Sequence, residues 1–380
     1  MSKVAVIPTT PQTVVDDYSD LLNLVEYQKI LNQKLKTIIK INLSWSLFYP
    51  ACSTPPWQLD GVLNKLIKDG YKQDLECVEN QTVVTHPWKG AYLNKWLQVL
   101  NQYDVPFYPL TNENWVTYKP KGDMIGMYDL FKEIIIPKKF MGNNMIHLPT
   151  IKTHGHTITT GAMKNAFGGL IPKFRHHSHR IIDDVLVDLL TIQKEIHPGL
   201  LAVMDGSVSG NGAGPRTMIP YLSNTLLASE DQVAIDAISA KLMGFDPLSI
   251  KYIKLAHDKG LGLGDIDQIE IIGMDKEKFN GINFHFETKK SIVIKWDQRI
   301  RKTTHKYRFL RPLHWLIFYT PLFRVNIWAS YIFHDLIWYP TAGKKHIKKF
   351  NESEWGKLFK KYPYGEKMKK FPKIKNWNPY

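Results

Sequence analysis

Residues 152–169 of this 380-residue chain read KTHGHTITTGAMKNAFGG. The stretch holds two His, two Lys, one Asn, four Thr and four Gly, but few bulky apolar side chains. A core helix or strand does not need this mixture, so we expect a loop that leads into a helix. Backbone N–H groups at a helix start bind anions, and Thr160 and Gly161 fall at the expected start. A titratable base and positive charge come from His154, Lys164 and Lys152, which predicts a catalytic site for a small anion.

Strand and helix patterns alternate on both sides of this stretch. Apolar, β-branched runs predict buried strands at residues 37–43, 75–78, 200–204, 225–229 and 269–273. Apolar residues at helical spacing predict helices at residues 14–35, 57–69, 90–102, 181–196, 234–242 and 247–258. This order favours an α/β fold with a mostly parallel sheet flanked by helices. We expect two lobes, roughly residues 1–145 and 146–288, with a cleft between them.

Polar residues at the ends of predicted strands extend the candidate site. In α/β sheets the carboxyl ends of the strands face the ligand crevice. Asp205 begins a Gly-rich loop at residues 205–215, where glycine permits close approach of the backbone to a ligand. A flexible turn is an equally good interpretation of that loop. The residues expected to bind substrate are Lys40, Asn42, Thr160, Gly161, Asn165, Asp205, Gly210, Asn211 and Gly212.

Metal ligation is a weaker prediction. The chain has two cysteines, which excludes an iron–sulfur cluster held by Cys ligands. A divalent metal remains possible, and its candidate ligands are His176, His177, His179, Glu230 and Asp231. A solvated basic loop for the histidines and helix capping for the carboxylates are the favoured alternatives.

Basic charge is concentrated in residues 289–380. That segment holds 22 Lys and Arg and five Asp and Glu, whereas the remaining chain holds 28 and 30. It also holds six of the eleven Trp. We therefore expect an α/β body at residues 1–288 and a helical, aromatic and basic C-terminal extension. Such helices bind anionic membrane surfaces; packing on the body is the alternative, and nucleic acid is less expected because no nucleic-acid module is present.

The N-terminal residues lack the pattern of a secretory signal, and two cysteines fit a reducing compartment. We expect a cytoplasmic protein, with peripheral contact at the inner membrane face through the extension. The sequence does not define the oligomeric state.

Three passages of the body resemble the domain-of-unknown-function family 362 (DUF362). They are KIN at residues 40–42, KTH with TGAMKNAFG at residues 152–168, and the segment from Val203 through GNG to ASEDQVAID at residues 228–236. The resemblance covers roughly residues 36–274. Some members of the family carry ferredoxin-like cluster domains, for which this chain lacks the cysteines.

The loop from His154 to Lys164 is also similar to that of nickel-pincer lactate racemases. The similarity implies that His154 is an acid/base and that Lys164 matches the lysine that holds the cofactor. It further implies His86 as a second acid/base and one of the three histidines at residues 176, 177 and 179 as a metal ligand. The glycine pair before the racemase lysine is replaced here by Ala162 and Met163, so we use the similarity for fold and pocket position only.

Two functions follow as hypotheses. The first is an enzyme that acts on a small anionic substrate, a hydroxy or sugar acid, by His/Lys-assisted proton or hydride chemistry of the isomerase, racemase or redox type. The second is a non-catalytic binding protein, peripherally bound to the membrane and associated with surface-glycan assembly.

Overall fold

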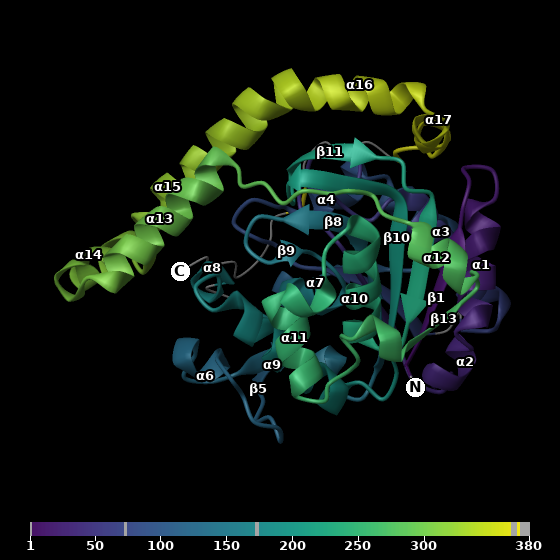
Figure 1. Ribbon diagram of the computed structural model, residues 1–380, viewed down its shortest axis with the longest axis horizontal. Helices are drawn as coiled ribbons and strands as arrows, with labels where there is room; N and C mark the ends of the chain where they lie inside the picture. Colours follow the sequence, from purple (N-terminus) through teal and green to yellow (C-terminus); the bar gives the residue numbers. More distant parts are fainter. Residues whose placement is uncertain (1, 72–73, 172–174, 366–370, 373–380) are drawn as a thin grey trace.

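The computed structural model describes residues 2–71, 74–171, 175–365 and 371–372 (Figure 1). Among these residues, eleven strands form one mixed sheet. The main path runs in the order β13 (Ile269–Ile272), β1 (Ser2–Pro8), β12 (Thr225–Ser229), β10 (Leu200–Ala213), β7 (Asn144–Leu148), β2 (Thr37–Ile41), β3 (Leu75–Glu79) and β4 (Phe107–Pro109). Beside the path, β10 also pairs with β8 (Thr150–His154) and β11 (Thr217–Tyr221), and β8 pairs with β9 (Ile158–Thr159).

Most of these pairings are parallel, which confirms the predicted α/β class. The antiparallel pairings are those of β12 with β1 and β10, of β11 with β10, and of β9 with β8. All five residues of β2 are buried. Ile38 packs in the core on one face of the sheet, whereas Ile39 and Ile41 pack in the core on the other. Successive side chains of a strand point to opposite faces, so one short apolar run contributes to both cores.

Amphipathic helices cover both faces of the sheet. The face that contains Ile38 is covered by α7 (Ala162–Leu170), α9 (Ile182–Ile196), α10 (Gln232–Met243) and α11 (Lys251–Asp258). The face that contains Ile39 is covered by α1 (Val14–Leu24), α3 (Pro56–Lys68), α5 (Trp96–Gln102), α16 (Lys344–Glu352) and α17 (Glu354–Lys361). Short helices connect these layers: α2 (Tyr27–Ile30), α4 (Pro87–Leu93), α6 (Met127–Leu130), α8 (Arg175–Ser178) and α12 (Lys276–Gly281). Two further strands, β5 (Trp115–Thr117) and β6 (Ile135–Pro137), form a small antiparallel sheet.

Two predicted elements differ from the structure. The expected helix at residues 14–35 ends at Leu24, because Glu26 adopts a left-handed conformation with φ 49°. The expected Gly-rich loop at residues 205–215 is mostly strand, since β10 continues to Ala213 and pairs with β11. A Cβ on Gly206 would lie 2.5 Å from Cδ1 of Ile151, and one on Gly210 would lie 2.4 Å from Sδ of Met218. These glycines therefore permit close packing within the fold.

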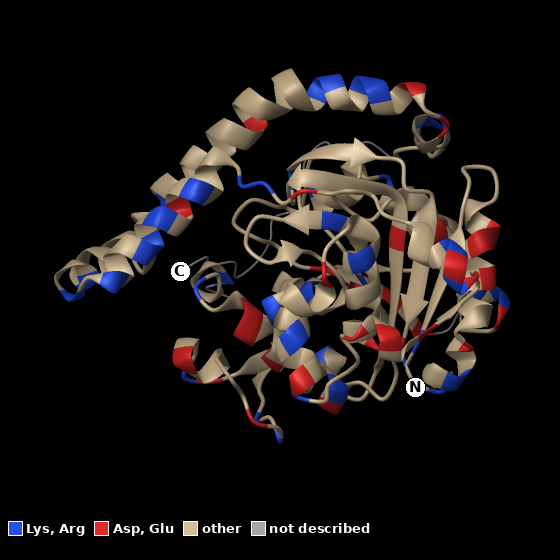
Figure 2. Ribbon diagram, viewed as in Figure 1, with Lys and Arg blue, Asp and Glu red and all other residues tan. Residues whose placement is uncertain are grey.

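The C-terminal extension is helical, as predicted. We call residues 292–343 the arm; it contains α13 (Ile292–Lys306), α14 (Arg311–Phe318), α15 (Phe323–Tyr331) and a π-helical segment (Ile332–Gly343). Figure 1 shows the arm extending to one side of the body, and Figure 2 shows Lys and Arg along it. The arm contacts the body where Trp45 Nε1 donates to Asp335 Oδ1 at 3.0 Å and Arg216 Nη2 donates to Ser330 Oγ at 2.9 Å. No helix within the described ranges is long and apolar enough to cross a membrane.

The predicted boundary between lobes falls within one continuous sheet. Strand β7 contains residues on both sides of the boundary at residue 145, and β1 pairs with two strands from the second half. The division into lobes stays a prediction.

Candidate functional site

A cavity of about 240 Å³ lies at the carboxyl ends of β2, β3 and β8. The loop at residues 81–84 and helices α7 and α8 complete its wall. It contains eight of the twelve predicted catalytic and substrate-binding residues: Lys40, Asn42, Lys152, His154, Thr160, Gly161, Lys164 and Asn165. The structure thus brings Lys40 and Asn42, from the end of β2, together with the polar residues of the stretch at residues 152–165. Apolar side chains of Val83, Val84 and Phe167 line the remainder.

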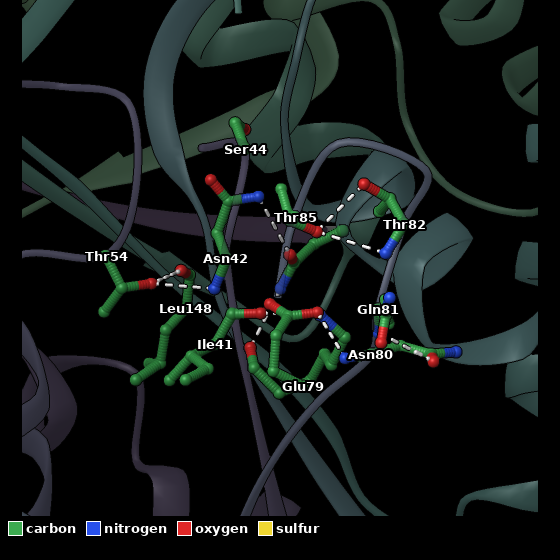
Figure 3. A network of polar contacts seen from close by, with 12 residues as sticks. Ile41, Asn42, Ser44, Thr54, Glu79, Asn80, Gln81, Thr82, Thr85 and Leu148 are labelled. Carbon is green, nitrogen blue, oxygen red and sulfur yellow. Dashed lines mark hydrogen bonds and ion pairs between the residues drawn. The ribbon is translucent and has the colours of Figure 1, made fainter. Parts of the chain in front are cut away.

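The floor of the cavity contains a buried ion pair. Lys40 Nζ lies 2.7 Å from Glu79 Oε1 and also donates to the Ile41 carbonyl at 2.6 Å. Figure 3 shows Glu79 Oε1 accepting the backbone N–H of Asn80, at 2.8 Å. Burial raises the pKa of Glu79 and lowers that of Lys40, while the attraction between the two charges opposes both shifts. The charge of Lys40 is thus largely balanced inside the protein.

Lys152 has a different environment. Its ammonium nitrogen donates to Asn42 Oδ1 at 2.5 Å, to the Cys52 carbonyl at 2.8 Å and to Thr150 Oγ1 at 2.7 Å. These acceptors are all uncharged, and within the described part of the chain no carboxylate forms an ion pair with Lys152. Burial lowers the pKa of Lys152 to about 8. A buried cation without an anionic partner is costly, so an anionic ligand beside it is favoured.

The side chains of His154, at the end of β8, and Lys164, in the first turn of α7, are in direct contact. His154 Nε2 lies 2.6 Å from Lys164 Nζ, and His154 Nδ1 accepts the backbone N–H of His156 at 3.1 Å. A backbone amide only donates, so the neutral imidazole carries its hydrogen on Nε2. That hydrogen points at Nζ, which must accept it with a lone pair. This network makes Lys164 a neutral amine, and burial lowers the pKa of both His154 and Lys164 in agreement.

The backbone N–H groups at the start of α7 bind a carboxylate of the protein itself. This corrects the expectation that they are free to bind a substrate anion. The backbone N–H groups of Ala162 and Met163 donate to the two carboxylate oxygens of Asp236, at 2.6 and 3.2 Å. Thr160 Oγ1 donates to the carbonyl of Lys152 at 3.2 Å. A Cβ on Gly161 would lie 2.0 Å from Asp236 Oδ1, so glycine makes room for this carboxylate rather than for a ligand. The helix dipole thus stabilises Asp236.

Four predicted substrate-binding residues lie outside the cavity. Asp205 accepts hydrogen bonds from Tyr18 at 2.6 Å and from Trp57 at 3.2 Å, on the side of the sheet covered by α1 and α3. Gly210, Asn211 and Gly212 belong to β10, where Gly210 and Gly212 accept from Thr153 through their carbonyls.

The weak metal candidates do not form one set of ligands, because the carboxylates lie apart from the histidines. Asp231 caps α10 by accepting from the backbone of Val233 and Ala234, as the capping alternative predicted. Glu230 lies beside it, outside the cavity. No group of three or more His, Cys, Asp or Glu suited to a metal ion occurs in the residues that the structure describes.

The clustered histidines instead contact the arm. The ring of His176 stacks on Phe323 with centroids 3.9 Å apart, and that of His177 lies 3.9 Å from Tyr319. His179 and His176 reach the edge of the cavity. His86 lies elsewhere and caps α4.

Two charged cavity residues, Glu79 and Arg175, were not among the predicted site residues. Glu79 is the last residue of β3. The rule that polar residues at the carboxyl ends of strands face the ligand crevice, which was applied to Lys40 and Asn42, would therefore have predicted it. Arg175 Nη2 donates to the Gln81 carbonyl at 2.7 Å, and Nε donates to Ile171 at 2.7 Å. Its position depends on a contact between distant segments, for which the sequence has no signal. With Arg175 included, the cavity lining among the described residues contains three Lys, one Arg, three His and one carboxylate.

Comparison with known proteins gives a family and a distant relative. A family model described as domain of unknown function (DUF362) matches residues 37–241. A thylakoid-associated protein of Synechocystis sp. is 26% identical over 178 residues, which is 45% of this chain. The match spans 51% of that protein, about half of its length. No solved structure matches. The similarity to lactate racemases stays a prediction.

Proposed function

The chain belongs to the DUF362 family, and we propose that it is an enzyme that moves a proton on a small anionic substrate, a hydroxy acid or a sugar acid. The observation that carries this proposal is the contact of 2.6 Å between His154 Nε2 and Lys164 Nζ, inside a cavity that also contains the basic side chains of Lys152 and Arg175. A general base must be unprotonated before the reaction, and the hydrogen bonds leave Lys164 in that state.

The surrounding residues supply the complementary functions. Lys152 and Arg175 attract the substrate carboxylate, and apolar side chains limit the access of water. Lys164 accepts a proton from the substrate. Its nitrogen then has no lone pair for His154, so the Nε2–H of His154 is released to donate to a substrate oxygen. Return of the proton from Lys164 to the same carbon regenerates the substrate, and its delivery to a neighbouring carbon completes a redox-neutral isomerisation.

Deuterium exchange tests this function across a panel of candidate substrates. Hydroxy and sugar acids are incubated with the protein in D₂O, and loss of the C–H signal next to the carboxylate is followed by NMR. We expect exchange in at least one acid, and its loss in His154→Ala and Lys164→Ala. His285→Ala is the matched control, because His285 is exposed and outside the cavity. Unchanged exchange in both cavity variants contradicts the proposal.

A second candidate is a non-catalytic, membrane-associated binding protein that serves surface-glycan assembly at the inner membrane face. Exposed aromatic side chains on the basic arm favour its membrane part: Trp296 is 59%, Trp315 59% and Trp328 67% exposed. Residues 289–343 hold ten Lys and Arg against two Asp. Aromatic residues with basic neighbours suit an anionic lipid surface. The distant relative is named as thylakoid-associated, which is compatible with this candidate.

Vesicle flotation tests the membrane part. Deleting the whole extension would uncover the core, because Phe350 and Trp355 are buried there. Substitution of Trp296, Trp315 and Trp328 by Glu avoids this problem. We expect the full chain to float with phosphatidylglycerol vesicles and the triple variant to remain at the bottom of the density gradient. Tyr128→Glu, at an exposed aromatic of the body, is the control. Equal flotation of the triple variant excludes the arm as the contact.

A further inference from the structure

Lys164 has the properties of a nucleophile as well as those of a base. Its amine accepts a hydrogen bond from His154 Nε2–H, so its single lone pair points at His154 and becomes free for a carbonyl carbon when that N–H turns to a substrate oxygen. Desolvation is the main cause of its low pKa, and the positive charge of Lys152 adds to it. Removal from water and a neighbouring cation are the two conditions that activate lysine toward carbonyl groups. An ordinary surface lysine is protonated at neutral pH and does not share this reactivity.

The same cavity contains groups suited to the remainder of a small oxo acid. The ammonium of Lys152 is held by three uncharged oxygens, and the guanidinium of Arg175 is held by the carbonyls of Ile171 and Gln81. Both therefore present positive charge in fixed positions. A volume of about 240 Å³ accommodates a compound of a few carbon atoms. A carboxylate next to a carbonyl matches this pairing of fixed cations with an amine.

We propose that Lys164 forms an imine with an anionic carbonyl compound of the 2-oxo acid class. The inference rests on the proposed function of the cavity as a site for small anions, and it adds 2-oxo acids to the hydroxy and sugar acids proposed above. The lone pair of Nζ attacks the carbonyl carbon, and the carbonyl oxygen takes the proton of His154 Nε2. The nitrogen loses one proton to His154, which passes it to the hydroxyl group, so that water leaves and a C=N bond forms. The iminium nitrogen then gives its remaining proton to His154, which restores Nε2–H and leaves the neutral imine. Amine and carbonyl thus give imine and water, with no oxidant or reductant.

Reductive trapping tests the proposal on the full-length protein. The protein is incubated near neutral pH with pyruvate and sodium cyanoborohydride, which reduces an imine to a stable secondary amine. Peptide mapping by mass spectrometry then locates the adduct, whose added mass equals pyruvic acid less one oxygen atom. We expect label on Lys164 well ahead of all other lysines. Label on surface lysines alone overturns the proposal.

Variants distinguish the imine from nonspecific labelling. Lys164→Arg keeps a basic side chain but forms no imine, so the adduct should disappear from that peptide. His154→Gln should slow labelling of Lys164 at least tenfold, because the proton donor is lost. Lys89→Arg is the control, since Lys89 lies outside this cavity. Equal labelling rates in the His154 variant and the native chain would contradict the role of His154.

The trapping and deuterium experiments separate the two proposals. Deuterium exchange that requires Lys164, without an adduct at Lys164, rejects the imine and leaves proton transfer intact. An adduct at Lys164 without deuterium exchange in any acid supports the imine and rejects the proposed proton transfer on hydroxy or sugar acids. Absence of both results rejects both proposals.

Discussion

At the scale of single residues, we expect the protonation of Lys152 to control anion binding. Burial lowers the pKa of this lysine to about 8, so it is charged at neutral pH and loses its charge as pH rises through that value. We expect sulfate affinity, measured by calorimetry from about pH 6 to about pH 10, to fall above about pH 8. Lys152→Gln should bind sulfate weakly at every pH. A native profile that stays flat across pH 8 would show that Lys152 does not contact the anion.

The same lysine affects stability in the opposite direction. The folded state binds the proton of Lys152 more weakly than the unfolded state, because the folded pKa is lower. Its contribution to stability therefore increases as pH rises from about 8 toward the ordinary lysine pKa of 10.5. We thus expect a rise in pH above about 8 to weaken anion binding at Lys152 and to increase the contribution of Lys152 to folding stability.

At the scale of elements, the start of α7 depends on the absence of a side chain. Gly161 has an extended backbone, which any residue adopts, yet a Cβ there would lie 2.0 Å from Asp236 Oδ1. Gly161→Ala should displace this carboxylate from Ala162 N and Met163 N and destabilise the fold by about 1–3 kcal/mol. Thermal or urea unfolding measures the effect. Gly281→Ala is the control, because a Cβ at Gly281 would have no neighbour within 4 Å. Equal midpoints for both variants would show that Asp236 relaxes freely.

The elements also show which features a sequence can predict. The strand at β2 and the helix at α9 were expected because local apolar patterns determine them, and eight cavity residues followed from their places at strand ends or in one polar stretch. The prediction of a loop around Gly206 and Gly210 was wrong, because a Gly-rich run also occurs where strands pack closely. The role of Asp236 could not be predicted, because its partners lie more than 70 residues away in sequence.

At the scale of the whole molecule, a hydrogen-bonded chain joins the arm to the cavity. Gln298 Nε2 in α13 lies 2.9 Å from His156 Nδ1, His156 N donates to His154, and His154 contacts Lys164. We therefore expect Gln298 to position His154 through His156. We expect Gln298→Leu to lower the rate of deuterium exchange several-fold without a change in unfolding midpoint, and to alter the ¹⁵N shifts of the His154 ring. Trp296→Ala on the exposed side of α13 is the control. Unchanged ring shifts in the Gln298 variant would contradict positioning through this chain.

The place of β1 in the sheet has a consequence for biosynthesis. This strand lies between β12 and β13, whose residues 225–229 and 269–272 are translated much later. While the ribosome produces the intervening chain, both edges of β1 lack their final neighbours. Pairing between distant segments is slow, and unpaired strand edges promote aggregation. We infer that the nascent chain completes its sheet only after residue 272 leaves the exit tunnel, and that until then a chaperone has two strand edges of β1 to shield.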